Sequence, residues 1–240
     1  MASSPSIPRS SLALRRIALL EGLSEERLDL LAQQCLWHSV EAGKPLLMRA
    51  AEQQGDVFLL VSGRVRVTTY SANGRQVTFR DSEAGEHFGD IAAIDGGPRS
   101  ADVVTLEASV LASLDRTAFM ALLRDEPVVA ERVMRRLASL VRQLSERVID
   151  LSTLGVQNRL HAELLRLARA AGVENNQARL EPAPRHAALA SQISTNREQV
   201  TRELNVLVRS GVLQKEGKAL LVADATRLES MVSQVRGDAG

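Results

Sequence analysis

Only one cysteine, Cys35, occurs in this chain of 240 residues. A single thiol excludes a disulfide framework, and it excludes metal or iron–sulfur sites built from several cysteines. The four histidines are scattered along the sequence without a motif that would hold haem. We therefore expect no metal, haem or iron–sulfur cluster, and we expect Cys35 to fill a core.

Long apolar runs are missing as well. No uninterrupted apolar segment is long enough to cross a bilayer. Residues 1–11 are rich in Ser and Pro and lack the apolar centre of a signal peptide. The sequence therefore predicts a flexible tail at 1–11 and a cytoplasmic protein that has no membrane partner.

Residue patterns of catalysis are also absent. The chain has no Ser–His–acid set, no cluster of metal ligands and no Gly-rich triphosphate loop with a lysine. We therefore expect a protein that is not an enzyme. What is present is an ordinary globular composition, 45% hydrophobic and 25% charged, in a chain long enough for two modest domains. The net charge is +1, and from residue 155 onward 12 basic residues exceed 9 acidic ones, which mildly supports a basic C-terminal module.

The most informative stretch runs from Phe88 to Ala101 and reads Phe-Gly-Asp-Ile-Ala-Ala-Ile-Asp-Gly-Gly-Pro-Arg-Ser-Ala. Two glycine-bearing turns bracket a short helical segment, and an arginine and a hydroxyl follow. The planar guanidinium of Arg99 matches a phosphate, and Ser100 with the following backbone N–H groups can complete the cradle. Asp90 can accept hydrogen bonds from neighbouring hydroxyls. A phosphate beside a sugar hydroxyl indicates a nucleotide.

Each of these residues has a plainer interpretation when it is taken alone. Asp90 fits a helix N-cap, 96–98 fit an ordinary turn, and Arg99 fits a surface charge. Only the ordered string favours a binding site.

Between residues 36 and 115, short β-rich runs recur between turn signals, at 57–61, 65–70, 77–79 and 110–114. Several short strands with Gly-containing hairpins are typical of a sandwich or jelly roll rather than a parallel sheet. Two short helices are expected before them, at 12–20 and 24–34.

The segment 127–153 predicts one long helix that begins with a proline, a residue suited to the first turn. Its apolar positions alternate in steps of four and three, which is the spacing of a coiled-coil seam between identical helices. The alternative is a helix packed on its own domain, with the β-domain absorbing part of this stripe. The seam residues are Ala130, Met134, Leu137, Val141, Leu144, Val148 and Leu151.

The C-terminal part predicts a helix at 160–171, a strand, two short helices at 186–192 and 196–210, and a hairpin at 212–222. Two such helices joined by a tight turn can place the second one in the major groove of DNA. Ser194 stands in the turn where glycine is common. The alternative for the polar residues of the second helix is a solvated face. The candidate DNA contacts are Ser194, Thr195, Asn196, Arg197, Glu198, Thr201 and Arg202.

Two motifs carry a resemblance that covers nearly the whole chain. The string 88–101 closely resembles the phosphate-binding cassette of cyclic-nucleotide-binding domains, and 197–202 (Arg-Glu-Gln-Val-Thr-Arg) resembles the recognition pattern of the cyclic AMP receptor protein (CRP/FNR) family of bacterial transcription regulators. The resemblance implies an α+β protein with a jelly-roll cyclic-nucleotide-binding domain at 12–126. A dimerisation helix at 127–153 and a winged helix-turn-helix domain at 154–240 would follow.

The resemblance also implies a function. A homodimer would bind a palindromic operator with half-sites similar to TGTGA, and binding of a 3′,5′-cyclic nucleotide would reorient its recognition helices. Double-stranded DNA and RNA polymerase are the expected partners. Two alternatives stay open, an effector-independent DNA binder of the same family and a nucleotide-gated protein-interaction module.

The effector is expected to be cyclic AMP or cyclic GMP, and two departures from the family pattern bear on the choice. Asp90 stands where Glu usually grips the ribose 2′-hydroxyl. Leu144-Ser145 stands where cyclic-AMP-responsive members place Thr-Ser against the purine, and Leu144 cannot hydrogen-bond a base edge. The implied contacts are Phe88, Gly89, Asp90, Ile91, Arg99, Ser100, Ala101, Leu144 and Ser145.

Overall fold

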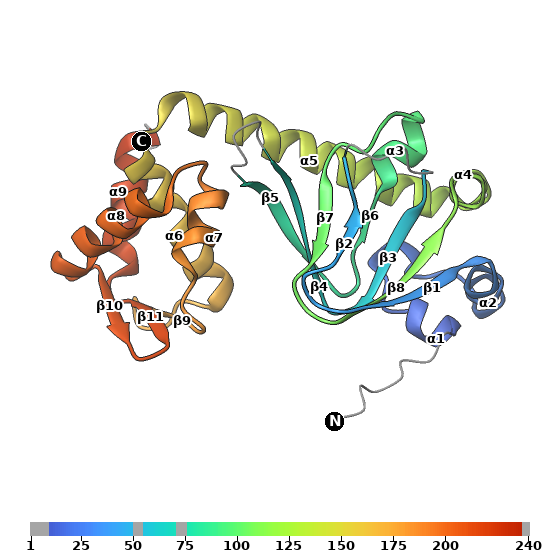
Figure 1. Ribbon diagram of the computed structural model, residues 1–240, viewed down its shortest axis with the longest axis horizontal. Coiled ribbons are helices and arrows are strands. Elements are labelled where there is room, and N and C mark those ends of the chain that lie inside the picture. The colour runs from blue at the N-terminus through green and yellow to red at the C-terminus, as the bar shows by residue number, and fades with distance from the viewer. Residues whose placement is uncertain (1–9, 50–54, 71–75, 237–240) are drawn as a thin grey trace. The chain divides into compact units, whose positions relative to one another are not determined.

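The computed structural model describes residues 10–49, 55–70 and 76–236 (Figure 1). The chain forms two compact units, Met1–Leu140 and Val141–Gly240, which we describe separately. The predicted tail lies outside the described residues as far as residue 9. No helix in the described part of the chain has the length and apolar character needed to span a membrane.

The first unit begins with two short helical pieces rather than the single helix predicted at 12–20. They are α1 (Ser11–Leu14) and a 3₁₀ turn, η1 (Ala18–Leu20). The prediction was wrong because the backbone N–H of Ala18 donates to the carbonyl of Gly85, at 2.9 Å, instead of continuing the helical ladder. Helix α2 (Glu25–Gln34) follows as predicted, with the Ser24 side chain capping its first turn.

Two antiparallel four-stranded sheets make up the β-domain, as predicted for a jelly roll rather than a parallel sheet. Their strand orders are β1-β8-β3-β6 and β2-β7-β4-β5. Side chains from both sheets form one buried cluster, which includes Leu60, Phe88 and Val103. The strands are β1 (Leu36–Val40), β2 (Pro45–Leu47), β3 (Val57–Ser62), β4 (Arg64–Tyr70), β5 (Gln76–Glu83), β6 (His87–Phe88), β7 (Asp102–Thr105) and β8 (Ser109–Leu114).

A second cluster of the first unit packs the helices against the outside of the sheet β1-β8-β3-β6. Cys35 belongs to it, and burial raises the pKa of this thiol to about 12, which agrees with the predicted core role. The helices on the C-terminal side are α3 (Asp90–Asp95), α4 (Arg116–Asp125) and α5 (Pro127–Thr153).

Helix α5 has the predicted bounds, but the β-domain takes up part of its apolar stripe. Val129 and Val133 are buried in the cluster with α1, α2 and α4, and Leu137, expected in the seam, packs partly buried against the same cluster. Met134 and Val141 remain 62% and 63% exposed. The stripe therefore divides between the helix's own domain and the surface.

The second unit contains a three-stranded antiparallel sheet of order β10-β11-β9 among helices. Helix α6 begins four residues before the predicted start, and α9 was not predicted. Strand β10 continues to Glu216, where Gly217 turns the wing with a φ of 57°. The elements are α6 (Val156–Ala171), β9 (Ala178–Leu180), α7 (His186–Gln192), α8 (Arg197–Arg209), β10 (Leu213–Glu216), β11 (Ala219–Val222) and α9 (Ala225–Arg236).

One buried histidine in α6 makes the stability of the second unit sensitive to acid. His161 is 2% exposed, and neither ring nitrogen has a hydrogen-bond partner among the described residues. Burial lowers the pKa of His161, because the apolar surroundings disfavour the charged ring. The folded protein therefore holds this imidazole in its neutral form.

Acid should destabilise the protein through His161. As the pH falls below 6.5, the ordinary pKa of histidine, His161 binds a proton in the unfolded chain but stays neutral in the folded chain. The free energy of unfolding should then decrease by at most ~1.4 kcal/mol per pH unit until the folded pKa is reached. His161→Leu should remove this slope. Urea unfolding followed by circular dichroism at several pH values compares the two proteins, which share the other three histidines. Equal slopes would contradict the prediction.

Candidate functional site

The cassette, residues 88–101, is shaped by two glycines in the left-handed region. Gly89 (φ 90°) precedes α3 and Gly96 (φ 70°) follows it. A Cβ at Gly89 would lie 2.6 Å from the carbonyl oxygen of Asp56 and 2.9 Å from Nη1 of Arg99. Only glycine permits that close approach, so strand β6, α3 and the arginine are brought together at this point.

Arg99 is buried within the cassette, with 4% of its surface exposed. Its Nη1 donates a hydrogen bond to the carbonyl oxygen of Gly89, at 3.0 Å. Burial lowers the pKa of Arg99, and the nearby carboxylate of Asp56 acts in the opposite direction. A guanidinium held in place by backbone is suited to binding a phosphate, because little side-chain freedom remains to be lost.

Of four further predicted contacts in the cassette, two are buried and two are exposed. Phe88 and Ala101 are buried, and the ring of Phe88 stacks on Phe58 with centroids 5.4 Å apart. Ile91 is 39% exposed and Ser100 is exposed beside Arg99. The structure joins Arg99 to Gly89 by a hydrogen bond, and contact of the seven predicted residues between 88 and 101 with a nucleotide stays a prediction.

Asp90 has a partner that the sequence interpretation did not identify. The side chain of Asp90 is buried, and Nη1 of Arg136, from helix α5, donates to its Oδ2. The second terminal nitrogen of Arg136 donates to the carbonyl oxygen of His87, at 3.0 Å. The His87 ring lies on the other side, with Nε2 3.6 Å from Oδ2 of Asp90.

The charge state of Asp90 follows from these neighbours. Burial acts to raise its pKa, but His87 and Arg136 outweigh burial, and the pKa lies below its ordinary value. Asp90 is therefore an ionised carboxylate that is already paired with a cation of α5.

A third arginine, Arg80, lies next to the Asp90–Arg136 pair. Arg80 of β5 donates to Glu86 at 2.6 Å, and its Nη2 lies 3.5 Å from the carbonyl oxygen of His87. Burial lowers the pKa of Arg80, and the positive charge of Arg136 lowers it further. Arg80 and Arg136 are each paired with a carboxylate, Glu86 and Asp90, so the charges of these two arginines are already compensated.

The spacing of α5 contains a signal for Arg136. The sequence interpretation placed this residue with the charges outside the seam. It follows the buried Val129 and Val133 at positions i+7 and i+3, so it lies on the buried face of the helix. A charged residue at such a position needs a buried partner, and Asp90 provides it.

Leu144 and Ser145 belong to the second unit. Leu144 is 51% exposed, and the hydroxyl of Ser145 donates back to the carbonyl of Val141, at 3.0 Å. Their contact with a purine stays a prediction.

Helix α8 of the second unit presents the predicted recognition face. Val200, Leu204 and Leu207 are buried, whereas Arg197, Glu198 and Arg202 are exposed. Asn196 caps the helix by accepting the Gln199 N–H at 2.8 Å. Contact of these side chains with DNA stays a prediction, which also includes the partly exposed Ser194, Thr195 and Thr201.

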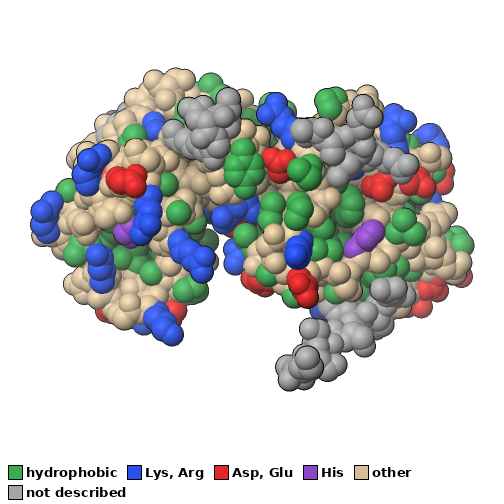
Figure 2. Space-filling view, in the orientation of Figure 1, with side chains coloured by type: hydrophobic (Ala, Val, Ile, Leu, Met, Phe, Trp, Pro, Cys, Tyr) green, Lys and Arg blue, Asp and Glu red, His purple; other side chains and the backbone are tan. Residues whose placement is uncertain are grey.

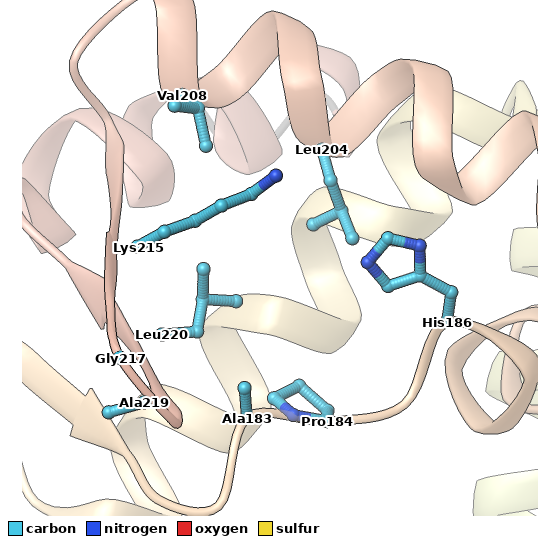
Figure 3. A pocket seen from close by; sticks show the side chains of 9 residues that line it. All are labelled: Ala183, Pro184, His186, Leu204, Val208, Lys215, Gly217, Ala219 and Leu220. Carbon is cyan, nitrogen blue, oxygen red and sulfur yellow. The ribbon is translucent and has the colours of Figure 1, made fainter.

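A histidine missed by the sequence interpretation adjoins this face. His186, at the start of α7, has its Nδ1 2.7 Å from the hydroxyl of Thr201, which itself donates to the carbonyl of Arg197 at 2.9 Å. His186 also lines a small, mostly apolar pocket with Leu204 of α8 and Lys215 of the wing (Figure 3). Burial lowers the pKa of His186, and the charges of Lys215 and Arg197 lower it further.

Basic groups are spread over this unit. Figure 2 shows many Lys and Arg side chains and few acidic ones on the visible face of the second unit. Such a surface suits the phosphate backbone of nucleic acid.

Comparison with known proteins gives matches to both parts of the chain. The family model for a cyclic nucleotide-binding domain matches residues 37–126, and that for a Crp-like helix-turn-helix domain matches residues 158–231. The chain is 31% identical over 215 residues to the cyclic AMP receptor protein of Thermus thermophilus, covering 89% of this chain and 95% of that protein. It is 26% identical over 217 residues to a CRP-like cAMP-activated global transcriptional regulator of Mycobacterium tuberculosis, covering 90% and 96%.

Solved structures agree in fold. The Thermus thermophilus catabolite activator protein matches 90% of this chain and 99% of its own with 29% identity and a TM-score of 0.51. A CooA variant from Carboxydothermus hydrogenoformans matches 90% and 94% at 21% identity with a TM-score of 0.75, which shows the shared fold alone. The predicted α+β architecture is confirmed.

The Asp90–Arg136 pair should contribute strongly to the stability of the first unit. Arg136→Gln leaves a buried carboxylate without a counter-charge and should cost about 3–5 kcal/mol of unfolding free energy. Adding Asp90→Asn should recover much of that loss, because the uncompensated charge disappears. Urea unfolding followed by the fluorescence of Trp37, the single tryptophan, reports on this unit.

Arg135→Gln is the matched control, since Arg135 is exposed and forms a surface ion pair with Glu131 of the same helix. It should change stability by less than about 1 kcal/mol. Additive effects of the Asp90 and Arg136 substitutions would refute the pair.

Proposed function

Because this chain belongs to the CRP/FNR family of bacterial transcription regulators, we propose that a cyclic nucleotide controls its binding to operator DNA as a homodimer. The observation that carries the proposal is the cassette. Arg99 is buried and held against Gly89, and the ionised Asp90 lies at the start of α3 beside it. These groups are the complements of a cyclic phosphate and a ribose hydroxyl.

Two charged residues of the cassette, Arg99 and Asp90, would bind different parts of the effector. Arg99 would donate to the phosphate, with Ser100 and the following N–H groups completing the cradle. A carboxylate has about four lone-pair sites, so Asp90 can hold Arg136 and still accept a hydrogen bond from the ribose 2′-hydroxyl. Bound nucleotide would then touch a group that already contacts α5.

Cyclic AMP and cyclic GMP are the two candidate effectors. The relatives named above include a cyclic AMP receptor and a cAMP-activated regulator, which supports cyclic AMP. Leu144 has no hydroxyl that could hydrogen-bond adenine in preference to guanine. We therefore expect weaker discrimination between the two bases than a hydrogen-bonding residue would give.

Helix α5 supports the homodimer. Five residues of the predicted seam are exposed, and an identical helix would remove them from water. They are Met134, Val141, Leu144, Val148 and Leu151.

The dimer would present two α8 helices to a palindromic operator. Arg197 and Arg202 can donate to guanine O6 and N7, and Glu198 can accept from cytosine N4. Two half-sites about one helical turn apart, each similar to TGTGA, would match the two-fold symmetry. A regulator of this kind would act through RNA polymerase at its promoters.

Nucleotide control should fail when Arg99 is removed. We expect the wild type to bind a duplex with two TGTGA half-sites more tightly in the presence of cyclic AMP or cyclic GMP. Arg99→Ala should weaken nucleotide binding by about 2–5 kcal/mol, since it removes a charge-assisted contact. Calorimetry measures the nucleotide affinity, and mobility shifts with and without nucleotide measure the DNA affinity.

The control is Arg124→Ala, an exposed arginine in the last turn of α4. If the DNA affinity of the wild type is the same with and without either nucleotide, the effector-independent alternative is supported. Nucleotide binding without DNA binding would support a protein-interaction module.

DNA binding should require the seam. Val141→Glu places a charge in an apolar interface and should yield monomers in sedimentation, with loss of operator affinity because only one half-site is read. Arg142→Glu changes the charge of the adjacent, exposed position and should leave the dimer intact. A dimeric Val141→Glu protein would refute the assigned interface.

A further inference from the structure

The turn between α7 and α8 ends α7 with a Schellman motif. Ser194 has a φ of 55°, in the left-handed region, and the N–H of Thr195 donates to the carbonyl of Ala190, at 2.9 Å. In this motif the carbonyl groups of the last helical residue and of the C-cap receive no hydrogen bond from the turn. Here they belong to Gln192 and Ile193.

Two arginines supply donors to those two carbonyl groups. Nη2 of Arg147, on α5, donates to the carbonyl oxygen of Gln192 and lies 3.4 Å from the hydroxyl of Ser194. Nε of Arg159, on α6, donates to the carbonyl oxygen of Ile193, at 3.0 Å. Positive charge at a helix C-terminus is also favoured by the helix dipole.

The same two arginines also link this turn to the C-terminal end of α5. Arg147 is a residue of α5 itself, one position before Val148 of the predicted seam. Nη1 of Arg159 donates to the carbonyl oxygen of Leu154, at 2.7 Å, directly after α5 ends at Thr153. The last turns of α5 and the turn of the helix-turn-helix are therefore joined through guanidinium groups, within one compact unit.

We infer that Arg147 is a positioning residue that transmits the arrangement of α5 to the recognition helix through the carbonyl group of Gln192. Helix α8 begins three residues after the turn residue Ser194, so a shift of the turn moves its N-terminal end, where the predicted base contacts lie. Arg159 joins the turn to the residue that follows α5 and completes the connection. This inference rests on the proposed control of DNA binding by a nucleotide.

Arg147 also accounts for serine at a turn position where glycine is common. A non-glycine residue in the left-handed region costs roughly 1 kcal/mol or more. The approach of the Arg147 guanidinium to the Ser194 hydroxyl offsets part of that cost, which a glycine could not receive.

The decisive measurement is the nucleotide affinity with and without a saturating operator duplex. In the wild type, operator should tighten cyclic nucleotide binding by the coupling factor, typically ~5–150-fold. In Arg147→Gln this factor should fall to within about threefold of one, while the nucleotide affinity without DNA stays within about twofold of wild type. Arg147→Lys, which keeps a donor and the charge, should restore part of the coupling.

Arg142→Gln is the matched control, an exposed arginine on the same helix, and it should keep the wild-type factor. Wild-type coupling in Arg147→Gln would overturn the inference. Absence of coupling in the wild type would instead contradict the proposed nucleotide control, which makes the two failures distinguishable.

Amide hydrogen exchange tests the contact itself without any nucleotide. Arg147→Gln should accelerate exchange at Thr195 by about tenfold or more and leave Val222 of the wing unchanged. Unchanged exchange at Thr195 would also overturn the inference. If Arg147→Gln accelerates exchange throughout the second unit, Arg147→Lys replaces it in both measurements, with a partial loss of coupling and a smaller acceleration at Thr195 expected. Wild-type values of both in Arg147→Lys would then overturn the inference.

Discussion

A buried ion pair between Asp90 and Arg136 joins the cassette to the long helix. Placing a carboxylate in a protein interior costs several kcal/mol unless a cation and hydrogen bonds accompany it. Arg136 meets that demand and also bonds the carbonyl of His87, so strand β6, α3 and α5 are tied at one point. The position of α5 on its domain depends on this contact together with the burial of Val129 and Val133.

In the second unit, arginines instead bind backbone carbonyl groups that would otherwise lack a hydrogen bond. A Schellman turn leaves two carbonyl groups of α7 to be satisfied, and guanidinium groups of α5 and α6 reach them. In both units an arginine connects the long helix to the segment that bears the predicted binding residues. The proposed function needs such connections, because a ligand shifts an equilibrium only when the two states differ in their contacts with it.

Much of this arrangement could be predicted from local patterns. The bounds of α5, the antiparallel β-domain and the helix-turn-helix followed from periodicity, turn residues and capping residues, each of which acts within a few residues of the chain. The helix predicted at 12–20 failed because a backbone bond from Ala18 to Gly85 competes with the helical ladder. Leu137 fits the heptad repeat, yet it packs on its own domain, since a repeat does not specify which surface covers it.

The candidate site shows the same division between local and distant causes. The sequence by itself determined the cassette, its two glycines, the buried stripe of α8 and the family, because their spacing is a local property. Only the tertiary structure decided that Arg136 pairs with Asp90, 46 residues away, and that Arg147 reaches Gln192, 45 residues away. Helix periodicity can place Arg136 on a buried face, but it does not identify a partner so far away in sequence. The partners meet only because packing places a buried charge or an unsatisfied carbonyl within reach of a long side chain.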